Sequence, residues 1–321
     1  MRKKLDFWLK ILVLFGFCVV LIFLLGAGFN NTSYAYAEEG AIDSDPFSEA
    51  DANAHPANGW DSKKEHYYEN SQQVCSKEIY DAKDKNWYWI DANGSVARNK
   101  DVYLQSNGGK WVRYDAAGHM VKGEDYRYGA WYYFDTTTGA MAKGITHVPS
   151  NGGKWVYYDL TTGKMLYGER YVNYDQSHAG WYHFDENIGA MSYGFYFNSP
   201  QHKWVYYDHA SGQMLYGEQL INGHWYDFDE STGAMQYGFV YLSKSQKWVF
   251  YDRRMGWMLY GEHPIDGAWY LLDAHTGAVQ YGWQGLGGKT VCYSWPSGKM
   301  LYGQQNVNNA TYYFDNRTGA L

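Results

Sequence analysis

The stretch INGHWYDFDESTGAMQYG, residues 221–238, decides the fold, because nearly every segment after residue 80 repeats it in one of two forms. The first form has a Trp, an aromatic run, an Asp, a short polar turn, Thr-Gly, Ala-Met and Tyr-Gly. The second form, as at residues 203–218, reads Lys-Trp-Val-Tyr-Tyr-Asp, then a turn, a Gly and Met-Leu-Tyr-Gly-Glu. The two forms alternate, so the function must be sought on a repeated surface rather than in a single pocket.

About eleven such units follow one another along the chain. Units of the first form begin at Trp87, Trp131, Trp181, Trp225, Trp269 and Thr311, and units of the second form begin at Trp111, Trp155, Trp204, Trp248 and Thr290. The commonest spacing between units of the same form is 44 residues. A regular period of this kind is typical of a solenoid, in which each unit contacts mainly its neighbours.

Each unit is predicted to form a β-hairpin. Residues 131–134 form an aromatic strand, residues 135–139 form a polar turn with a glycine suited to positive φ, and residues 140–142 begin the return strand. Side chains alternate across a strand, so both faces of the hairpin are aromatic. An isolated hairpin is marginal in water, and stacking of neighbours must therefore supply the stability. The predicted fold class is an all-β solenoid of stacked hairpins of two alternating types.

The composition agrees with a repeat array rather than a conventional core. Aromatic residues make up 20% of the chain and there are 36 glycines, so Trp and Tyr must supply most of the buried area. The formal net charge is −7 and no cluster of Lys and Arg follows the first residues. Because binding to nucleic acid needs such a cluster, we predict no nucleic-acid partner.

Residues 1–37 are predicted to be a secretory signal peptide. Basic residues at positions 2–4 precede an apolar run, residues 11–28, and Ala-Tyr-Ala at residues 35–37 is a small-x-small cleavage pattern. The alternative is an uncleaved membrane anchor, because the apolar run is almost long enough to cross a bilayer. Both interpretations place the rest of the chain outside the cytoplasm.

The remainder divides into three segments. Residues 38–63 are rich in Asp, Ala, Asn, Ser and Pro and are expected to be a flexible spacer. Residues 64–80 resemble a unit of the second form, with Cys75 in the place of Met258, and are expected to be a degenerate terminal repeat. Residues 81–321 form the array. Cys75 and Cys292 would lie near opposite ends of a linear stack, so no disulfide is expected between them.

No catalytic or metal-binding pattern is present. The Asp that ends each aromatic run is predicted to accept hydrogen bonds from turn amides; the series is Asp135, Asp159, Asp185, Asp208, Asp229, Asp252, Asp273 and Asp315. The histidines lack metal-ligand spacing, and neither a nucleophile elbow nor a phosphate-binding loop occurs. We predict no enzymatic activity, no catalytic residue, no metal and no cofactor.

The aromatic residues are the remaining candidates for function. Most of them must form the core, yet a hairpin array has more aromatic faces than contacts between repeats can cover. Shallow aromatic grooves suit the C–H faces of sugar rings and quaternary ammonium groups, which are attracted to π faces. Many weak sites on one array bind a repetitive polymer through avidity.

Units such as Gly-Ala-Trp-Tyr-Tyr-Phe-Asp-Thr-Thr-Thr-Gly-Ala-Met, residues 129–141, resemble the cell-wall-binding repeats of Gram-positive autolysins, lysozymes and surface proteins. These repeats are also called choline-binding repeats, and the same type occurs in glucan-binding proteins. The resemblance covers residues 81–321. It implies a superhelical solenoid with ligands held between consecutive hairpins, in cages of aromatics from two neighbouring repeats plus a Met. One of these aromatics directly follows the Gly that ends a repeat.

That position alternates in this chain. It holds Ile145, Phe195, Phe239 and Trp283 after units of the first form, and Glu124, Glu169, Glu218, Glu262 and Gln304 after units of the second form. Only every other junction can therefore close an aromatic cage. The resemblance implies the ligand-binding residues Trp181, Met191, Phe195 and Trp204 at one junction, Trp225, Met235, Phe239 and Trp248 at the next, and Trp269 and Trp283 at an incomplete third. The Glu series is either a partner for a cation or for sugar hydroxyls, or a set of solvated residues.

The sequence thus predicts a non-catalytic protein that binds cell-wall or extracellular polysaccharide, with or without choline, through grooves between repeats. The expected partners are cell-wall polysaccharide, the choline of teichoic acid or an α-glucan, and the membrane only if the leader stays uncleaved. The expected location is secreted or on the cell surface of a Gram-positive bacterium. Two alternatives remain open: a structural or adhesin array that binds a host or partner protein, and the targeting module of a cell-wall hydrolase whose catalytic domain is lacking.

Overall fold

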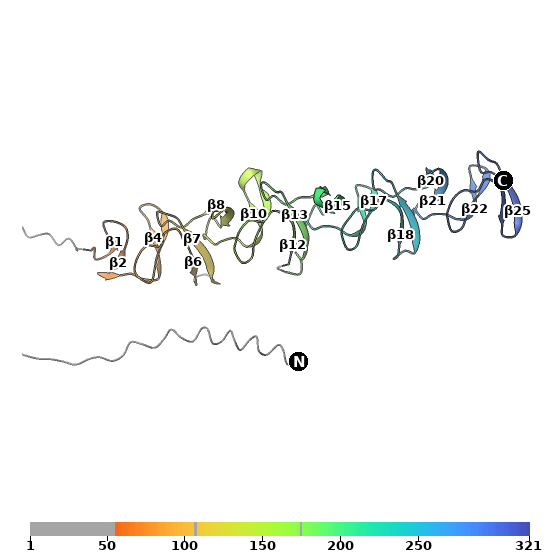
Figure 1. Ribbon diagram of the computed structural model, residues 1–321. Coiled ribbons are helices and arrows are strands. Elements are labelled where there is room, and N and C mark those ends of the chain that lie inside the picture. The colour runs from red at the N-terminus through yellow and green to blue at the C-terminus, as the bar shows by residue number, and fades with distance from the viewer. Residues whose placement is uncertain (1–54, 106–107, 174) are drawn as a thin grey trace, which may run out of the picture. The chain divides into compact units, whose positions relative to one another are not determined.

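The computed structural model describes residues 55–105, 108–173 and 175–321. The predicted signal peptide and residues 38–54 of the predicted spacer lie outside the described residues. Residues His55–Leu321 form one unit, whose described elements are short strands and short 3₁₀ helices (Figure 1). The first strands are β1 (Gly59–Trp60), β2 (Tyr67–Glu69) and β3 (Gln72–Gln73).

The later strands are β4 (Lys77–Asp81), β5 (Asn86–Ile90), β6 (Lys100–Leu104), β7 (Lys110–Tyr114), β8 (Gly123–Arg127), β9 (Ala130–Phe134), β10 (Gly144–Val148), β11 (Lys154–Tyr158), β12 (Gly168–Val172), β13 (Gly180–Phe184), β14 (Gly194–Asn198), β15 (Lys203–Tyr207), β16 (Gly217–Ile221), β17 (His224–Phe228), β18 (Gly238–Leu242), β19 (Lys247–Tyr251), β20 (Gly261–Ile265), β21 (Ala268–Leu272), β22 (Gly282–Leu286), β23 (Lys289–Tyr293), β24 (Gly303–Val307) and β25 (Ala310–Phe314). The 3₁₀ helices are η2 (Ser150–Gly152) and η3 (Ser199–Gln201).

From β4 onward the strands pair two by two, in sequence order, as antiparallel hairpins. Each of the pairs from β4–β5 to β24–β25 is a separate two-stranded sheet, which gives eleven hairpins in the described part of the chain. In β18–β19, for example, Phe239 lies opposite Phe250 and Tyr241 lies opposite Trp248. The predicted all-β solenoid of about eleven alternating hairpins is confirmed.

The hairpin turn lies before the aromatic strand, which corrects the prediction that it follows. Strand β9 pairs with β8, and the expected return strand, residues 140–142, contributes only an isolated bridge between Phe134 and Met141. The turn of this hairpin is Tyr128-Gly129, with φ of 55° and 73°. Two successive residues of positive φ are the type I′ geometry, whose twist matches that of the paired strands. The Asp-to-Gly segment forms a wider turn that ends the hairpin.

The segment after this wider turn connects each hairpin to the one before it. The Met235 N–H donates to the carbonyl of Trp204, and the Met258 N–H donates to the carbonyl of Trp225, both at 2.8 Å. The same bond recurs along the array, from Met120 on Trp87 to Leu321 on Thr290. No return strand forms because the amide that would extend it is bonded to the neighbouring hairpin.

The Asp series stabilises the wider turns as predicted. Oδ1 of Asp229 accepts hydrogen bonds from the N–H groups of Ser231 and Thr232, at 3.1 and 2.8 Å, and from both of their hydroxyls. Equivalent bonds occur at Asp135, Asp159, Asp208 and Asp273. Hydrogen bonds to the carboxylate favour its ionised form, and they lower the pKa of Asp229. The series is therefore structural.

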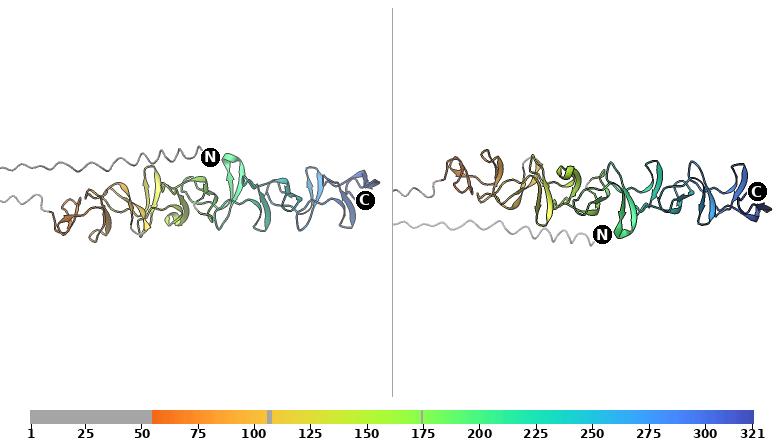
Figure 2. Two further views of the ribbon diagram at one scale, coloured as in Figure 1. Left: turned by 90° about the horizontal axis from the view of Figure 1, so that it is seen from below. Right: turned by 90° about the horizontal axis from the view of Figure 1, so that it is seen from above.

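The core consists of small clusters between consecutive hairpins rather than one interior. In the cluster around β16–β17, Tyr226 and Phe228 pack with Ile221, Tyr206 and Met235. The alternation along a strand buries Tyr226 and Phe228 and leaves Trp225 half exposed. Consecutive hairpins project to different sides of the array (Figure 2). Each hairpin therefore has one aromatic face in a cluster and a second that stays partly accessible.

The first hairpin is covered at its N-terminal side by the small sheet β1–β2–β3. Trp60 and Tyr67 pack against a cluster that contains Val74 and Tyr88, so β1 begins inside the stretch expected to be a spacer. The sequence alignment placed Cys75 at the position of Met258, whose side chain is buried. In the structure Val74 is buried and Cys75 is exposed, so Cys75 does not occupy the position equivalent to Met258. The reason is the tight β2–β3 turn, which shifts the following residues relative to the other units.

The glycine of the wider turn is expected to be essential for stacking. At Gly212, φ is 75°, and a Cβ would lie 2.2 Å from Sδ of Met191. We expect Gly212→Ala to lower the free energy of unfolding by about 2 kcal/mol or more, from the positive φ and the overpacking together. Gly223→Ala is the matched control, because its φ is 81° but no atom lies within 4 Å of the added Cβ. Urea denaturation measures the free energy of unfolding of both variants. An equal decrease in the two would contradict the packing argument.

Candidate ligand-binding grooves

The Trp that begins each aromatic strand lies at a junction between hairpins. The side chains of Trp181, Trp225 and Trp248 are 40%, 39% and 46% exposed. The backbone carbonyl of each accepts the N–H of the connector that follows the next hairpin. The residue that donates this N–H, usually Met, is therefore placed beside the preceding Trp, and a groove opens between them.

Two kinds of groove alternate, according to the residue that follows the Gly at the start of the Trp hairpin. We call the junctions with Glu124, Glu169, Glu218 and Glu262 the Glu grooves, and those with Ile145, Phe195 and Phe239 the aromatic grooves. The structure shows cavities at Glu124, Glu169 and Phe239, and the other junctions have equivalent positions in the repeat. All four glutamates are half-buried, whereas Gln304 at the equivalent position of the last unit is exposed. The alternation follows from the two forms of the repeat.

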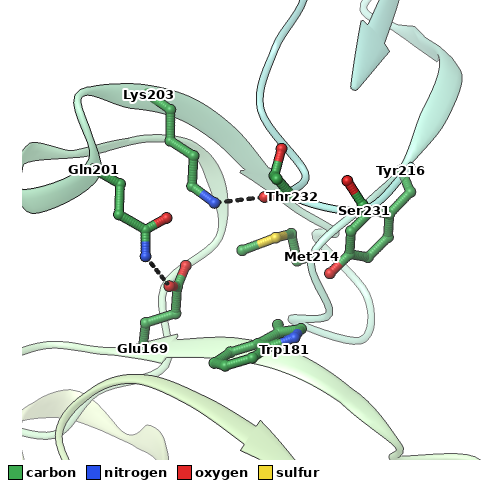
Figure 3. A pocket seen from close by; sticks show the side chains of 8 residues that line it. All are labelled: Glu169, Trp181, Gln201, Lys203, Met214, Tyr216, Ser231 and Thr232. Atoms are coloured by element: carbon green, nitrogen blue, oxygen red, sulfur yellow. Dashed lines mark hydrogen bonds between the residues drawn. The ribbon is translucent and has the colours of Figure 1, made fainter. Parts of the chain in front are cut away.

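The Glu169 groove encloses about 210 Å³ (Figure 3). Trp181, Met214 and Tyr216 supply apolar walls, while Glu169 and Lys203 supply charge. The Glu169 carboxylate accepts hydrogen bonds from the hydroxyl of Tyr207, at 3.1 Å, and from Nε2 of Gln201, at 3.4 Å. Lys203 Nζ donates to the carbonyl of Thr232 on the next connector. Burial and the neighbouring Glu169 raise the pKa of Tyr207, so its hydroxyl keeps the proton that it donates.

The Glu124 groove repeats this arrangement around about 320 Å³. Trp131, Met165 and Tyr167 form its apolar walls. Lys154 Nζ lies 3.9 Å from Oε1 of Glu124 and donates to the carbonyl of Ile188 at 2.7 Å. Ser150, from η2, also lines the groove, and its buried hydroxyl has no hydrogen-bond partner within the described residues.

The Phe239 groove shows the second kind of chemistry, in about 350 Å³. Phe239, Trp248, Tyr270 and Tyr281 line it together with Val279, Pro296, Ser297 and Lys299, and none of its lining residues is acidic. The Phe239 ring centroid lies 4.9 Å from that of Tyr270 on the next hairpin. This groove is therefore a predominantly aromatic box built by two consecutive hairpins and a connector.

The ten residues predicted for ligand binding are distributed differently from the expected junctions. Phe239 and Trp248 share a groove, and Phe195 and Trp204 share the equivalent hairpin, β14–β15. Trp181 and Trp225, however, begin Glu grooves, where their connectors bring Met214 and Met258. The buried Met191 and Met235 instead bond to Trp155 and Trp204, Trp269 bonds to Met300, and Trp283 packs on Tyr312. The first two expected junctions thus each combined residues of three successive grooves.

The sequence analysis missed the Lys of the second form. Lys154, Lys203, Lys247 and Lys289 each donate to the carbonyl of the residue before the Gly in the next wider turn. The Tyr before the repeat Gly lines both kinds of groove, as Tyr216 and Tyr281 show. The repeated Lys before Trp is visible in the sequence. Its hydrogen-bond partner lies on a later hairpin, so it could be identified only from the stacked structure.

One aromatic groove is replaced by a buried ion pair. Arg113 and Asp101 occupy the positions of Phe250 and Phe239. The Arg113 side chain is 1% exposed; its Nε lies 2.6 Å from Asp101 Oδ1 and its Nη1 lies 2.8 Å from Asp125 Oδ2. The guanidinium lies 4.1 Å from the ring centroid of Tyr132. The guanidinium of Arg113 therefore occupies the position beside the Tyr132 ring.

Removal of this guanidinium should destabilise the array. Arg113→Ala leaves Asp101 and Asp125 beside an apolar cluster without their partner, at a cost of about 3 kcal/mol. The double variant Asp101→Phe/Arg113→Phe copies the aromatic groove and should recover most of this loss. Denaturant titration of both variants measures the effect. A double variant as unstable as the single one would show that the ion pair does not simply replace an aromatic contact.

Asp227 is the unusual carboxylate of the array. It lies opposite Glu218 in β16–β17, and both line a cavity of about 320 Å³ with Glu230 and Lys244. Burial first, and then the charges of Glu218, Glu230 and Asp229, raise the pKa of Asp227 to about 6. The equivalent positions in other units of the first form hold Tyr133, His183 and Leu271. Ionised Asp227 is therefore unfavourable to the stacking of this hairpin.

The stability of the array should depend on the protonation of Asp227. An unfolded Asp loses its proton near pH 4, whereas folded Asp227 holds it to about pH 6, so this contribution to stability is lost as pH rises between these values. We expect Asp227→Asn to raise the unfolding temperature at neutral pH and to change it little at about pH 4. Circular dichroism melts at both pH values test this. An equal gain at both would exclude ionisation as the cause.

The described residues also bear on metal binding and on membrane crossing. No group of three or more His, Cys, Asp or Glu is arranged to hold a metal ion in the part of the chain that the structure describes. No helix among the described residues is long and apolar enough to cross a membrane.

Comparisons with known proteins match the repeat and the fold. The family model of the choline-binding repeat matches residues 104–144 and 200–237. The solved structure of CbpJ from Streptococcus pneumoniae TIGR4 is 22% identical, with 80% of this chain and 96% of that chain covered and a TM-score of 0.59. Choline binding protein F from Streptococcus pneumoniae is 24% identical, over 76% and 92% of the two chains, with a TM-score of 0.49. No curated protein matches the sequence.

The fold and its repeated grooves define a solenoid of β-hairpin repeats, a fold shared with CbpJ. The chain carries choline-binding repeats, and its resemblance to the cell-wall-binding repeat family of Gram-positive surface proteins is confirmed.

Proposed function

We propose that the array binds a choline-bearing cell-wall polymer at the surface of a Gram-positive bacterium, and that it acts by binding and not by catalysis. The observation that carries this proposal is the aromatic box of Phe239, Trp248, Tyr270 and Tyr281 in repeats of the choline-binding type. The proposed location agrees with the predicted signal peptide. Secretion and the retention of the protein on the wall are part of the proposal.

The chemistry of this box suits a quaternary ammonium. Such a cation has no N–H to donate, so it gains little from carboxylate or amide acceptors and is held by aromatic faces, at about 0.5–2 kcal/mol for each contact. Phe239 and Trp248 come from hairpin β18–β19, and Tyr281 comes from the connector that bonds to Trp248. Their three rings border one volume. Val279 takes the place that Met holds in other units, which keeps the wall apolar.

A second box has the same composition at equivalent positions. Phe195 and Trp204 belong to hairpin β14–β15, and the connector that bonds to Trp204 brings Met235 and Tyr237. Phe195 packs 5.1 Å from Tyr226, as Phe239 packs on Tyr270. At the next aromatic position Thr290 replaces the Trp beside Trp283. A polymer that occupies both boxes at once would be bound far more firmly than a ligand in one box alone.

The proposal predicts that free choline competes with the wall. Excess choline chloride should elute the protein from purified choline-containing walls and change its Trp fluorescence. Phe239→Ala with Trp248→Ala should weaken choline binding at that box about tenfold, the loss of roughly 1.4 kcal/mol of cation–π contact. Trp131→Ala, in the Glu124 groove, is the matched control and should leave choline affinity unchanged. Retention on walls in the presence of excess choline would refute the proposal.

A further inference from the structure

We propose that the four Glu grooves are a second class of ligand site, which takes the hydroxyl-rich ring of a neutral sugar and not a quaternary ammonium. The grooves repeat one set of five residue types at equivalent positions. The sets are Glu124, Trp131, Lys154, Met165 and Tyr167; Glu169, Trp181, Lys203, Met214 and Tyr216; Glu218, Trp225, Lys247, Met258 and Tyr260; and Glu262, Trp269, Lys289, Met300 and Tyr302. This inference stands independently of choline binding by the aromatic grooves.

The carboxylate of a Glu groove already has partners within the chain. In the Glu124 groove, Lys154 Nζ lies 3.9 Å from the carboxylate, so the groove already contains an ammonium. In the Glu169 groove, the carboxylate accepts bonds from Tyr207 and Gln201, and Lys203 lines the same space. Like charges repel more strongly where water is excluded. A quaternary ammonium would approach this Lys, as it would approach Lys299 in the Phe239 groove, so the carboxylate and the hydroxyl and amide groups, and not the Lys, distinguish the two kinds of groove.

The same groups suit a neutral ring with hydroxyls. The half-exposed face of Trp181 offers a flat apolar surface to the C–H face of a sugar, and Tyr216 and Met214 border it (Figure 3). Glu169 accepts hydrogen bonds, while Ser231 and Gln201 both donate and accept them. Sugar hydroxyls also do both, so one ring can bond to each of these groups. An apolar wall with a few convergent polar groups is the usual form of a specific small-ligand site.

The Glu124 groove adds an independent observation. The hydroxyl of Ser150 is buried, lines the groove and has no hydrogen-bond partner within the described residues. A buried polar group without a partner costs about 1–3 kcal/mol, which a ligand hydroxyl at this point would recover. Asn151 and Asn187 line the same space and supply amide groups. A cation without hydrogen-bonding groups would leave Ser150 unsatisfied.

The experiment separates the two classes of groove by paired sets of substitutions in the full chain. The first set replaces the Trp of each Glu groove by Ala, at Trp131, Trp181, Trp225 and Trp269. The second set does the same in the aromatic grooves, at Trp155, Trp204 and Trp248. Both sets should keep the fold, because the bond between hairpins uses the Trp carbonyl and not the side chain. Circular dichroism checks this for each set.

The probes are the methyl glycosides of glucose, galactose and N-acetylglucosamine, observed by saturation-transfer NMR, and choline chloride, observed by calorimetry. We expect at least one glycoside to bind the unmodified chain, and its signal to fall at least fivefold in the first set only. Choline binding should fall in the second set only. The set Glu124→Ala, Glu169→Ala, Glu218→Ala and Glu262→Ala should weaken the glycoside signal with choline binding unchanged, which tests the carboxylates without altering the aromatic wall.

Three outcomes would overturn the inference: no glycoside binds, the glycoside signal survives the first set, or choline binding falls in the first set as much as in the second. The first two outcomes do not involve choline. Failure of choline to bind the unmodified chain would refute the proposed function while the glycoside result still stood.

Discussion

The array depends on one backbone hydrogen bond, from the connector after each hairpin to the carbonyl of the Trp in the hairpin before it. Met258 on Trp225 and Met300 on Trp269 are two examples, each at 2.8 Å. A two-stranded hairpin has too little buried surface to be stable alone. The bond joins neighbouring hairpins in a constant register, and the small clusters of Tyr, Phe and Met form around it. Stability is therefore distributed along the chain rather than concentrated in one core.

The same bond creates the grooves. It places a connector beside the exposed Trp of the previous hairpin, so the grooves at Glu124, Glu169 and Phe239 each receive a Trp wall, an apolar floor and a Tyr. What differs is the residue after the repeat Gly, which is Glu169 at one junction and Phe239 at another. One architecture thereby presents two chemistries in alternation, and each is repeated along the array. This arrangement suits a polymer with more than one kind of chemical group in each repeating unit.

Local substitutions show how far the repeat tolerates change. Arg113 fills one junction with an internal cation, which its two aspartate partners make acceptable in a buried place. Asp227 puts a second carboxylate opposite Glu218, where neighbouring units have aromatic or apolar side chains. Neither change alters the strands around it, because the bonds of the hairpin and of the connector are made by the backbone. The variation therefore affects the junctions and leaves the fold intact.

Much of this protein was determined by sequence alone: the eleven units, their two forms, the all-β class and the turn role of residues such as Asp229. These features are local, since they follow from alternation along a strand and from turn chemistry. The sequence did not determine which strand pairs with which, and it therefore joined Trp181 to Met191 rather than to Met214. It also missed the place of Lys203. Both depend on contacts between hairpins, and only the stacked structure, through the bond that commits each Met amide to its neighbour, decides which residues share a groove.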